Sequence, residues 1–153
     1  MVDKKSIDNE VMLSKVAELI ALGHTVTILV KGHSMNPFLR NGRDHVTLAP
    51  FKTSHLQPGV VVLAREKGSG RIVLHRIIHR KGDCLTLQGD GNVYGTEQTM
   101  AHLVMGQVTE MIRGTKHYAA DGCIWRCYSC CWIRLKPVRR WLLAAYRLMF
   151  RDW

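Results

Sequence analysis

The feature of this sequence that most constrains its fold is a series of short β-branched and apolar runs, separated by turns that contain glycine. The run at 60–64 is apolar at every position, which is typical of a strand buried on both faces, and Pro58-Gly59 forms the turn before it. Such a series favours a mainly β (β-rich α+β) fold, either a sandwich or a partly open barrel, over an alternating α/β fold. Strands are predicted at 25–31, 44–49, 60–65, 71–79, 84–88 and 106–113.

The chain of 153 residues is long enough for one sizeable core, and its sequence divides into three segments. Residues 1–24 contain apolar positions at helical spacing over 6–22, which predicts an amphipathic helix packed on the domain and ended by Gly23. Residues 25–116 hold the predicted strands. Residues 117–153 form a basic segment, rich in cysteine and tryptophan, that contains a second amphipathic helix.

The net charge of +10 is concentrated toward the C-terminus. From Glu110 onward the sequence has nine lysines and arginines against three acidic residues, so this part carries +6 of the total. Such a charge favours an acidic partner, nucleic acid or an anionic membrane surface, although a solvated basic face explains it as well. Nucleic acid is disfavoured, because the predicted helix at 6–22 is too short for a helix-turn-helix and the β region has no basic residues interleaved with aromatics.

Residues 137–150 carry the second amphipathic helix, with Pro137 at its first position. Its arginines lie mainly outside an apolar stripe. The stripe consists of Trp141, Leu142, Ala145, Leu148 and Met149. This pattern suits peripheral contact with an anionic membrane, and it suits a partner protein or the domain's own surface almost as well.

Four of the five cysteines crowd into nine residues, at Cys123, Cys127, Cys130 and Cys131. This spacing matches neither a secreted disulfide framework nor the separated ligand pairs of a zinc site, so no metal and no other cofactor is predicted. Packing, lipid attachment and redox chemistry stay open as roles for these cysteines. A secretory signal peptide and a membrane-spanning window are both lacking, which predicts a cytoplasmic protein whose membrane contact, if it has any, is peripheral.

A serine lies in a stiff loop directly after the predicted strand at 25–31. Ser34 belongs to the stretch K-G-H-S-M-N-P-F-L, in which Gly32 permits a sharp turn and Pro37 restricts the backbone. Acyl-transfer enzymes present a nucleophile on such a bend, beside backbone N–H groups that bind the oxyanion. The predicted oxyanion and substrate-cleft residues are Gly32, His33 and Met35. An ordinary strand-to-loop turn is the alternative interpretation.

Two further motifs supply a base and an acid. His75 lies in the predicted strand V-L-H-R-I-I, and a neutral imidazole is a suitable general base for a serine hydroxyl. Asp90 lies in the turn L-Q-G-D-G-N after the next strand, where a carboxylate is able to orient the imidazole. Each motif also has a structural interpretation, because strand histidines are often structural and Gly-Asp-Gly-Asn is a common tight turn.

Together, four sequence boxes resemble those of the signal peptidase I superfamily, which includes the LexA-type self-cleaving repressors. The boxes read G-H-S-M-N-P-F-L, G-R-D-H-V-T-L-A-P, V-L-H-R-I-I and L-Q-G-D-G-N, in this order. The resemblance implies the coiled antiparallel sheets of that catalytic domain. It also implies cleavage of a peptide bond, with Ser34 as the nucleophile.

The residue at the position of the general base selects a branch of this superfamily. Bacterial signal peptidases and LexA-like proteins have a lysine there, whereas ER-type and SipW-like enzymes have a histidine. His75 stands at this position, so the chain resembles the Ser-His branch, in a compact bacterial form without an N-terminal membrane anchor. By the same resemblance Asp90 is the acid that supports the base, with Glu97 and Asp44 as the alternatives.

The sequence thus predicts a serine endopeptidase that acts on a peptide or protein. Its catalytic residues are Ser34, His75 and Asp90. Two other interpretations remain: a non-catalytic module that binds an extended peptide on the same fold, and a LexA-like regulatory protein that cleaves itself.

Overall fold

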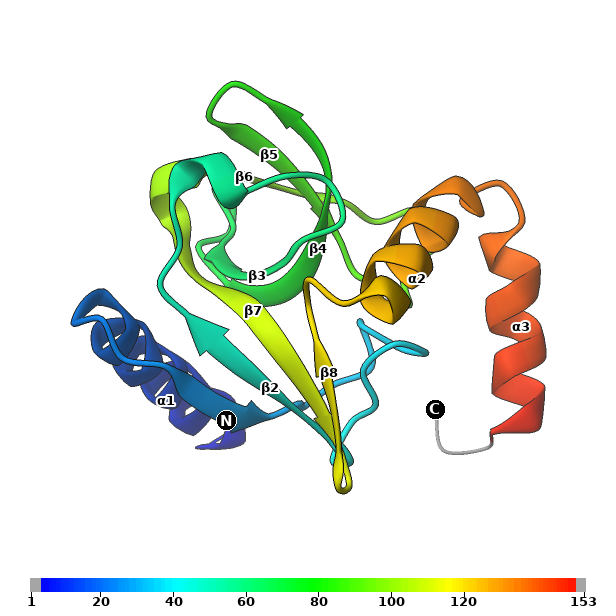
Figure 1. Cartoon of the computed structure of the whole chain (residues 1–153), viewed down its shortest axis with the longest axis horizontal. Coiled ribbons are helices and arrows are strands. Elements are labelled where there is room, and N and C mark those ends of the chain that lie inside the picture. Colours follow the sequence, from blue (N-terminus) through cyan, green and yellow to red (C-terminus); the bar gives the residue numbers. More distant parts are fainter. Residues whose placement is uncertain (1–3, 151–153) are drawn as a thin grey trace.

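The computed structural model describes residues 4–150, and the side chains of residues 10–150. An eight-stranded sheet curls into a half-barrel (Figure 1). One helix precedes the sheet in the chain, and two helices follow it. All strand pairs are antiparallel, which confirms the predicted mainly β fold class. The strands are β1 (Val26–Leu29), β2 (Asp44–Ala49), β3 (Val61–Arg65), β4 (Ile72–Lys81), β5 (Cys84–Gln88), β6 (Glu97–Met100), β7 (Val104–Arg113) and β8 (Lys116–Ala119).

The strand order in the sheet is β1-β2-β7-β3-β4-β5-β6, and β8 pairs with β7. Each of the six predicted strands is present, within a few residues at either end. The sequence analysis missed β6 and β8, whose sequences Glu-Gln-Thr-Met and Lys-His-Tyr-Ala lack the apolar alternation that identifies a half-buried strand. The predicted boundary between the β region and the C-terminal segment, after residue 116, falls at the start of β8, because this strand extends the sheet past that residue.

Strand β3 separates two clusters of buried apolar side chains. Val61 and Leu63 belong to the cluster that also holds residues of the N-terminal helix, the loop after β1 and the first C-terminal helix. Val62 and Ala64 belong to the second cluster, together with Ile77 and residues of β5. The uninterrupted apolar run is therefore a strand buried on both faces, as the sequence predicts.

Helix α1 (Lys4–Ala21) packs on β7 and β1 and contributes Val16 and Ile20 to the core. Gly106 makes room for it, since a Cβ there would lie 2.7 Å from Cδ1 of Ile20. Gly23 follows the last turn of the helix, and its φ of 91° confirms the predicted left-handed cap.

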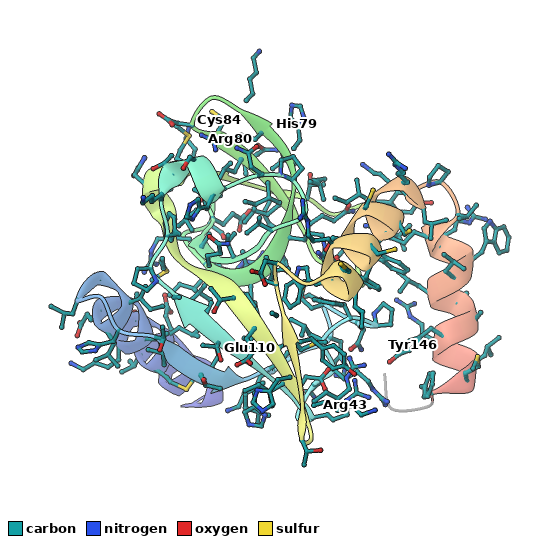
Figure 2. The ribbon with its side chains drawn as sticks, in the orientation of Figure 1. Arg43, His79, Arg80, Cys84, Glu110 and Tyr146 are labelled. Atoms are coloured by element: carbon teal, nitrogen blue, oxygen red, sulfur yellow. The ribbon has the colours of Figure 1, made fainter. Side chains whose placement is uncertain are left out.

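Two helices follow the sheet, α2 (Cys123–Arg134) and α3 (Arg139–Met149), and the sequence analysis predicted only the second. Helix α2 buries Trp125, Ser129 and Trp132 against the sheet and the loop after β1. Its four cysteines are free and exposed on the opposite side, whereas Cys84 lies near His79 and Arg80 at the turn of the β4–β5 hairpin (Figure 2). Two 3-10 helices, Thr53–His55 and Ala101–Leu103, complete the elements.

The side of helix α3 that packs on the rest of the molecule is not the side that carries its apolar stripe. Arg139 and Leu143 are its buried residues, and Tyr146 projects toward the loop that carries Arg43 (Figure 2). The apolar side chains of the stripe are exposed instead. Among the residues that the structure describes, no helix has both the length and the apolar character needed to cross a membrane.

Candidate active site

Ser34 lies in the loop between β1 and β2, which is closed at its base by backbone hydrogen bonds. The N–H of Val30 donates to the carbonyl of Asp44, and that of Gly42 donates to the carbonyl of Val30, each at 2.9 Å. The buried side chains of Met35 and Leu39 anchor the loop in the core. These contacts tie both sides of the loop that carries Ser34 to the rest of the domain.

The turn that follows β5 packs directly on this serine loop. The N–H of Gly91 donates to the carbonyl oxygen of Ser34 at 2.8 Å. A Cβ at Gly89 would overlap that same oxygen and would lie 3.0 Å from Nε2 of His75, and a Cβ at Gly91 would lie 2.7 Å from the carbonyl of His33. The two glycines of Gly-Asp-Gly-Asn are therefore required by close approach of two backbones, and not only by the turn itself.

Ser34 and His75 line the same cavity, which has a volume of about 170 Å³. The cavity lies between the end of β1, the serine loop, the first half of β4 and residues 12 and 13 of α1, and most of its lining is apolar. Within residues 10–150, the Ser34 hydroxyl makes no hydrogen bond to the imidazole. Catalytic hydrogen bonds are often long in enzymes without substrate, so this geometry is compatible with a serine and a base that engage on binding.

The imidazole of His75 is oriented by Glu97, with 2.8 Å between Nδ1 and the carboxylate Oε2. The strand register explains this contact, because Ile77, Leu87 and Glu97 are aligned across β4, β5 and β6 and so lie on one face of the sheet. His75 precedes Ile77 by two residues and therefore points to this face as well. Both groups are largely buried.

The sequence analysis preferred Asp90 as the acid beside His75, and the structure corrects this assignment. Asp90 lies on the other side of β4, where its two carboxylate oxygens accept hydrogen bonds from Nε and Nη2 of Arg76, at 2.9 and 2.7 Å. Adjacent strand residues point to opposite faces, so a carboxylate that pairs with Arg76 is directed away from His75. Glu97, one of the two alternatives, occupies the predicted position of the acid.

Arg76 is the centre of a buried cluster that sequence reasoning missed. Its guanidinium also donates to the carbonyl of Gly59 at 2.9 Å and to the hydroxyl of Ser129, and it lies 4.8 Å from the centre of the Phe38 ring. An arginine inside the largely apolar run V-L-H-R-I-I was the available signal, because a buried arginine needs polar or charged partners. Burial and the nearby Asp90 carboxylate raise the pKa of the Tyr128 hydroxyl, which belongs to the same cluster.

Asp44, the other alternative acid, pairs with arginines and has no contact with His75. Its carboxylate accepts hydrogen bonds from Arg43 at 2.7 and 2.9 Å and from Arg113 at 3.2 and 3.1 Å. The N–H of Arg40 also donates to it, at 2.9 Å. Burial by itself would raise the pKa of Asp44, but these hydrogen bonds outweigh burial and hold the pKa below its ordinary value. Asp44 thus closes the serine loop and takes no part in the cavity.

The three predicted cleft residues have different positions. Gly32 and Met35 line the cavity with Ser34, whereas His33 does not, and its ring lies 3.3 Å from the amide of Asn36. The N–H of Gly32 donates to Oδ1 of Asn41 at 3.1 Å, so it is not available to an oxyanion. In the described part of the chain, the N–H groups of Ser34 and Met35 donate to no protein acceptor. They are the better candidates for oxyanion donors.

A second cavity, of about 900 Å³, lies between β3, β7 and α2 and contains neither Ser34 nor His75. Among the residues that the structure describes, no group of three or more histidine, cysteine or acidic side chains is arranged to hold a metal ion.

The candidate active site consists of Ser34, His75 and Glu97, supported by the glycine turn.

Comparison with known proteins leaves the family of this chain open. No protein-family model matches the sequence, and no curated protein matches it.

Removing either partner of the Arg76–Asp90 pair should destabilise the fold strongly. Arg76→Met and Asp90→Asn each leave a buried polar or charged group without its partner, and we expect each to lower the free energy of unfolding by about 3–5 kcal/mol. Urea unfolding followed by circular dichroism measures this change. The matched control is Arg71→Met, which breaks the exposed ion pair with Glu66 and should cost less than about 1 kcal/mol. Equal losses in the control and the buried variants would contradict the role given to the pair.

The Asp44 carboxylate should make stability depend on pH. The pKa of Asp44 is lower in the folded than in the unfolded state. The stability that the carboxylate contributes is therefore fully present above the ordinary aspartate pKa of about 3.9. This stability is lost as the pH falls through the pKa of the folded state. Asp44→Asn should therefore lower the free energy of unfolding by about 2 kcal/mol at neutral pH. The difference from wild type should shrink below about pH 4. Urea unfolding at a series of pH values tests this, with Asp83→Asn, an exposed turn residue, as the control.

Proposed function

We propose that this chain is a serine peptidase, with Ser34 as the nucleophile, His75 as the general base and Glu97 as the residue that positions the base. The observation that carries the proposal is the placement of His75, which lines the Ser34 cavity while its Nδ1 lies 2.8 Å from the Glu97 carboxylate. The resemblance of the four sequence boxes to the signal peptidase I superfamily supports the same assignment of Ser34 and His75. In this proposal Asp90 has a structural role.

The contact with Glu97 selects the tautomer of the imidazole that catalysis needs. When Nδ1–H donates to the carboxylate, Nε2 carries the free electron pair, and Nε2 is the nitrogen near the serine loop. His75 then takes the proton of the Ser34 hydroxyl as Oγ attacks the scissile carbonyl. The N–H groups of Ser34 and Met35 bind the oxyanion, and His75 returns the proton to the leaving amine. Water, activated by the same imidazole, hydrolyses the acyl-enzyme.

The surroundings of the cavity suit a peptide as the substrate. Strand β1 is an edge of the sheet, and its residues 28 and 29 line the cavity. Across the cavity, residues 72–75 of β4 pair with β3, and the pairing of β4 with β5 starts only at Arg76. An extended segment is able to enter between these strands and hydrogen bond to a free edge, while its side chains occupy the apolar lining.

Replacement of the nucleophile is the direct test of the proposal. Ser34→Ala should lower the rate of peptide hydrolysis by about 10³-fold or more, because no other group forms the acyl-enzyme. The measurement is cleavage of a degenerate peptide library followed by mass spectrometry, with Ser54→Ala, an exposed serine elsewhere, as the matched control. Cleavage by wild type that persists in Ser34→Ala would refute the proposal. Binding of peptides by the wild type without any cleavage would instead favour a non-catalytic peptide-binding module.

The role of Glu97 has a matched control within the chain, because Glu110 makes a similar contact with His117 at 2.9 Å, at an exposed position on β7. Glu97→Gln should lower kcat by about 10²-fold or more and leave KM nearly unchanged, because it disturbs the orientation of the base and not the substrate cleft. Glu110→Gln should change neither constant. Steady-state kinetics on a peptide found in the library experiment measures both. A Glu97→Gln variant with the kcat of wild type would exclude Glu97 as the positioning residue.

A further inference from the structure

We propose that helix α3 docks on an anionic lipid surface through its exposed apolar side. This inference concerns a surface remote from Ser34, and it does not depend on the proposed peptidase activity. We define the docking face as Trp141, Leu142, Ala145, Leu148 and Met149.

The docking face is the apolar part of α3 that the rest of the molecule leaves uncovered. The exposed fractions are 65% for Trp141, 40% for Leu142, 84% for Leu148 and 75% for Met149. An amphipathic helix that served only the fold would bury these side chains. Four large apolar side chains on one helix therefore indicate an interaction surface rather than single exposed residues.

The opposite side of α3 attaches the helix to the molecule and so fixes which side is exposed. Arg139 donates to Oε1 of Gln88 at 2.9 Å and to the carbonyl of Trp132 at 3.0 Å, and Leu143 is buried next to it on the helix. With these contacts in place, α3 stands at the outer edge of the molecule, beyond α2 (Figure 1). The docking face is presented outward without any rearrangement.

The charge around the docking face selects the kind of partner. Between Asp121 and Asp152 the sequence has seven lysines and arginines and no acidic residue. Arg140 lies beside the face, with its guanidinium 4.5 Å from the centre of the Trp141 ring. Helices that lie in an anionic membrane interface typically place apolar side chains in the acyl region. Arginines and a tryptophan then flank these side chains at the level of the headgroups.

Other occupants fit these observations less well. A second copy of the chain would bring the same basic segment against itself, and the chain as a whole carries +10, so like charges would oppose that dimer. Nucleic acid would meet the arginines but would leave the apolar side chains without a partner. With 11 residues, α3 is shorter than the about 20 residues that span a bilayer, so it would lie in the plane of the interface.

Vesicle flotation with the full chain tests the proposal. We expect the wild type to float with vesicles of phosphatidylcholine and phosphatidylglycerol in equal parts, to bind vesicles of phosphatidylcholine alone much more weakly, and to be released by salt at about 0.5 M. Trp141→Ser with Leu148→Ser should weaken binding about tenfold or more, because it removes apolar area from the face. Lys136 is an exposed residue in the connection between α2 and α3, and Lys136→Gln with Arg140→Gln should weaken binding on the order of tenfold.

The matched control is Val11→Ser with Leu22→Ser, which removes two exposed apolar side chains at and after α1, on the other side of the molecule (Figure 1). Its binding should equal that of the wild type. Circular dichroism and thermal unfolding verify that all variants are folded. The proposal is overturned if the wild type does not float with anionic vesicles, or if Trp141→Ser with Leu148→Ser floats as the wild type does. A wild-type dimer in light scattering that this double variant converts to a monomer would also overturn it, in favour of a second copy.

Discussion

The buried ion pair between Arg76 and Asp90 is the contact on which the arrangement of this molecule depends, because it joins segments far apart in the sequence. Arg76 belongs to β4, and Asp90 lies in the glycine turn that packs on the serine loop. The same guanidinium reaches Ser129 of α2 and the ring of Phe38. A buried pair of this kind adds little net stability by itself, but an unpaired partner would be costly, so only the arrangement that satisfies both groups is favourable.

Alternation along β4 separates this structural pair from the candidate chemistry. His75 and Arg76 are neighbours, so their side chains leave the strand on opposite faces. One face carries His75, which lines the Ser34 cavity and contacts Glu97, and the other carries Arg76 to Asp90. The turn that holds Asp90 also donates from Gly91 to the Ser34 carbonyl, so the ion pair connects the serine loop, through this turn, to the strand that bears His75.

Local patterns in the sequence predict six of the eight strands and the cap at Gly23, because each depends on periodicity or on a turn residue. The acid beside His75 depends on register across three strands. A polar strand such as β6 has no periodic signal, so Glu97 was not assigned to a strand that reaches the histidine. Asp90 was preferred because its turn resembles the acidic box of the superfamily, yet the requirement to neutralise a buried arginine determines its position.

A second buried arginine explains why the orientation of α3 does not follow from its sequence. An apolar stripe on a helix ordinarily predicts the buried side, but here the anchor is Arg139, which is buried and lies 5.2 Å from the centre of the Trp132 ring. Burial lowers the pKa of this guanidinium. Its Nη1 donates to Gln88 and its Nη2 to the Trp132 carbonyl, whereas its buried Nε has no hydrogen-bond partner among the described residues. Gln88 is the register partner of Arg76 in the sheet. The two buried arginines, Arg76 and Arg139, therefore connect α2, α3 and the glycine turn to β4, the strand that carries His75. A polar anchor of this kind leaves the apolar side of the helix free, which is the condition that a surface for lipid requires.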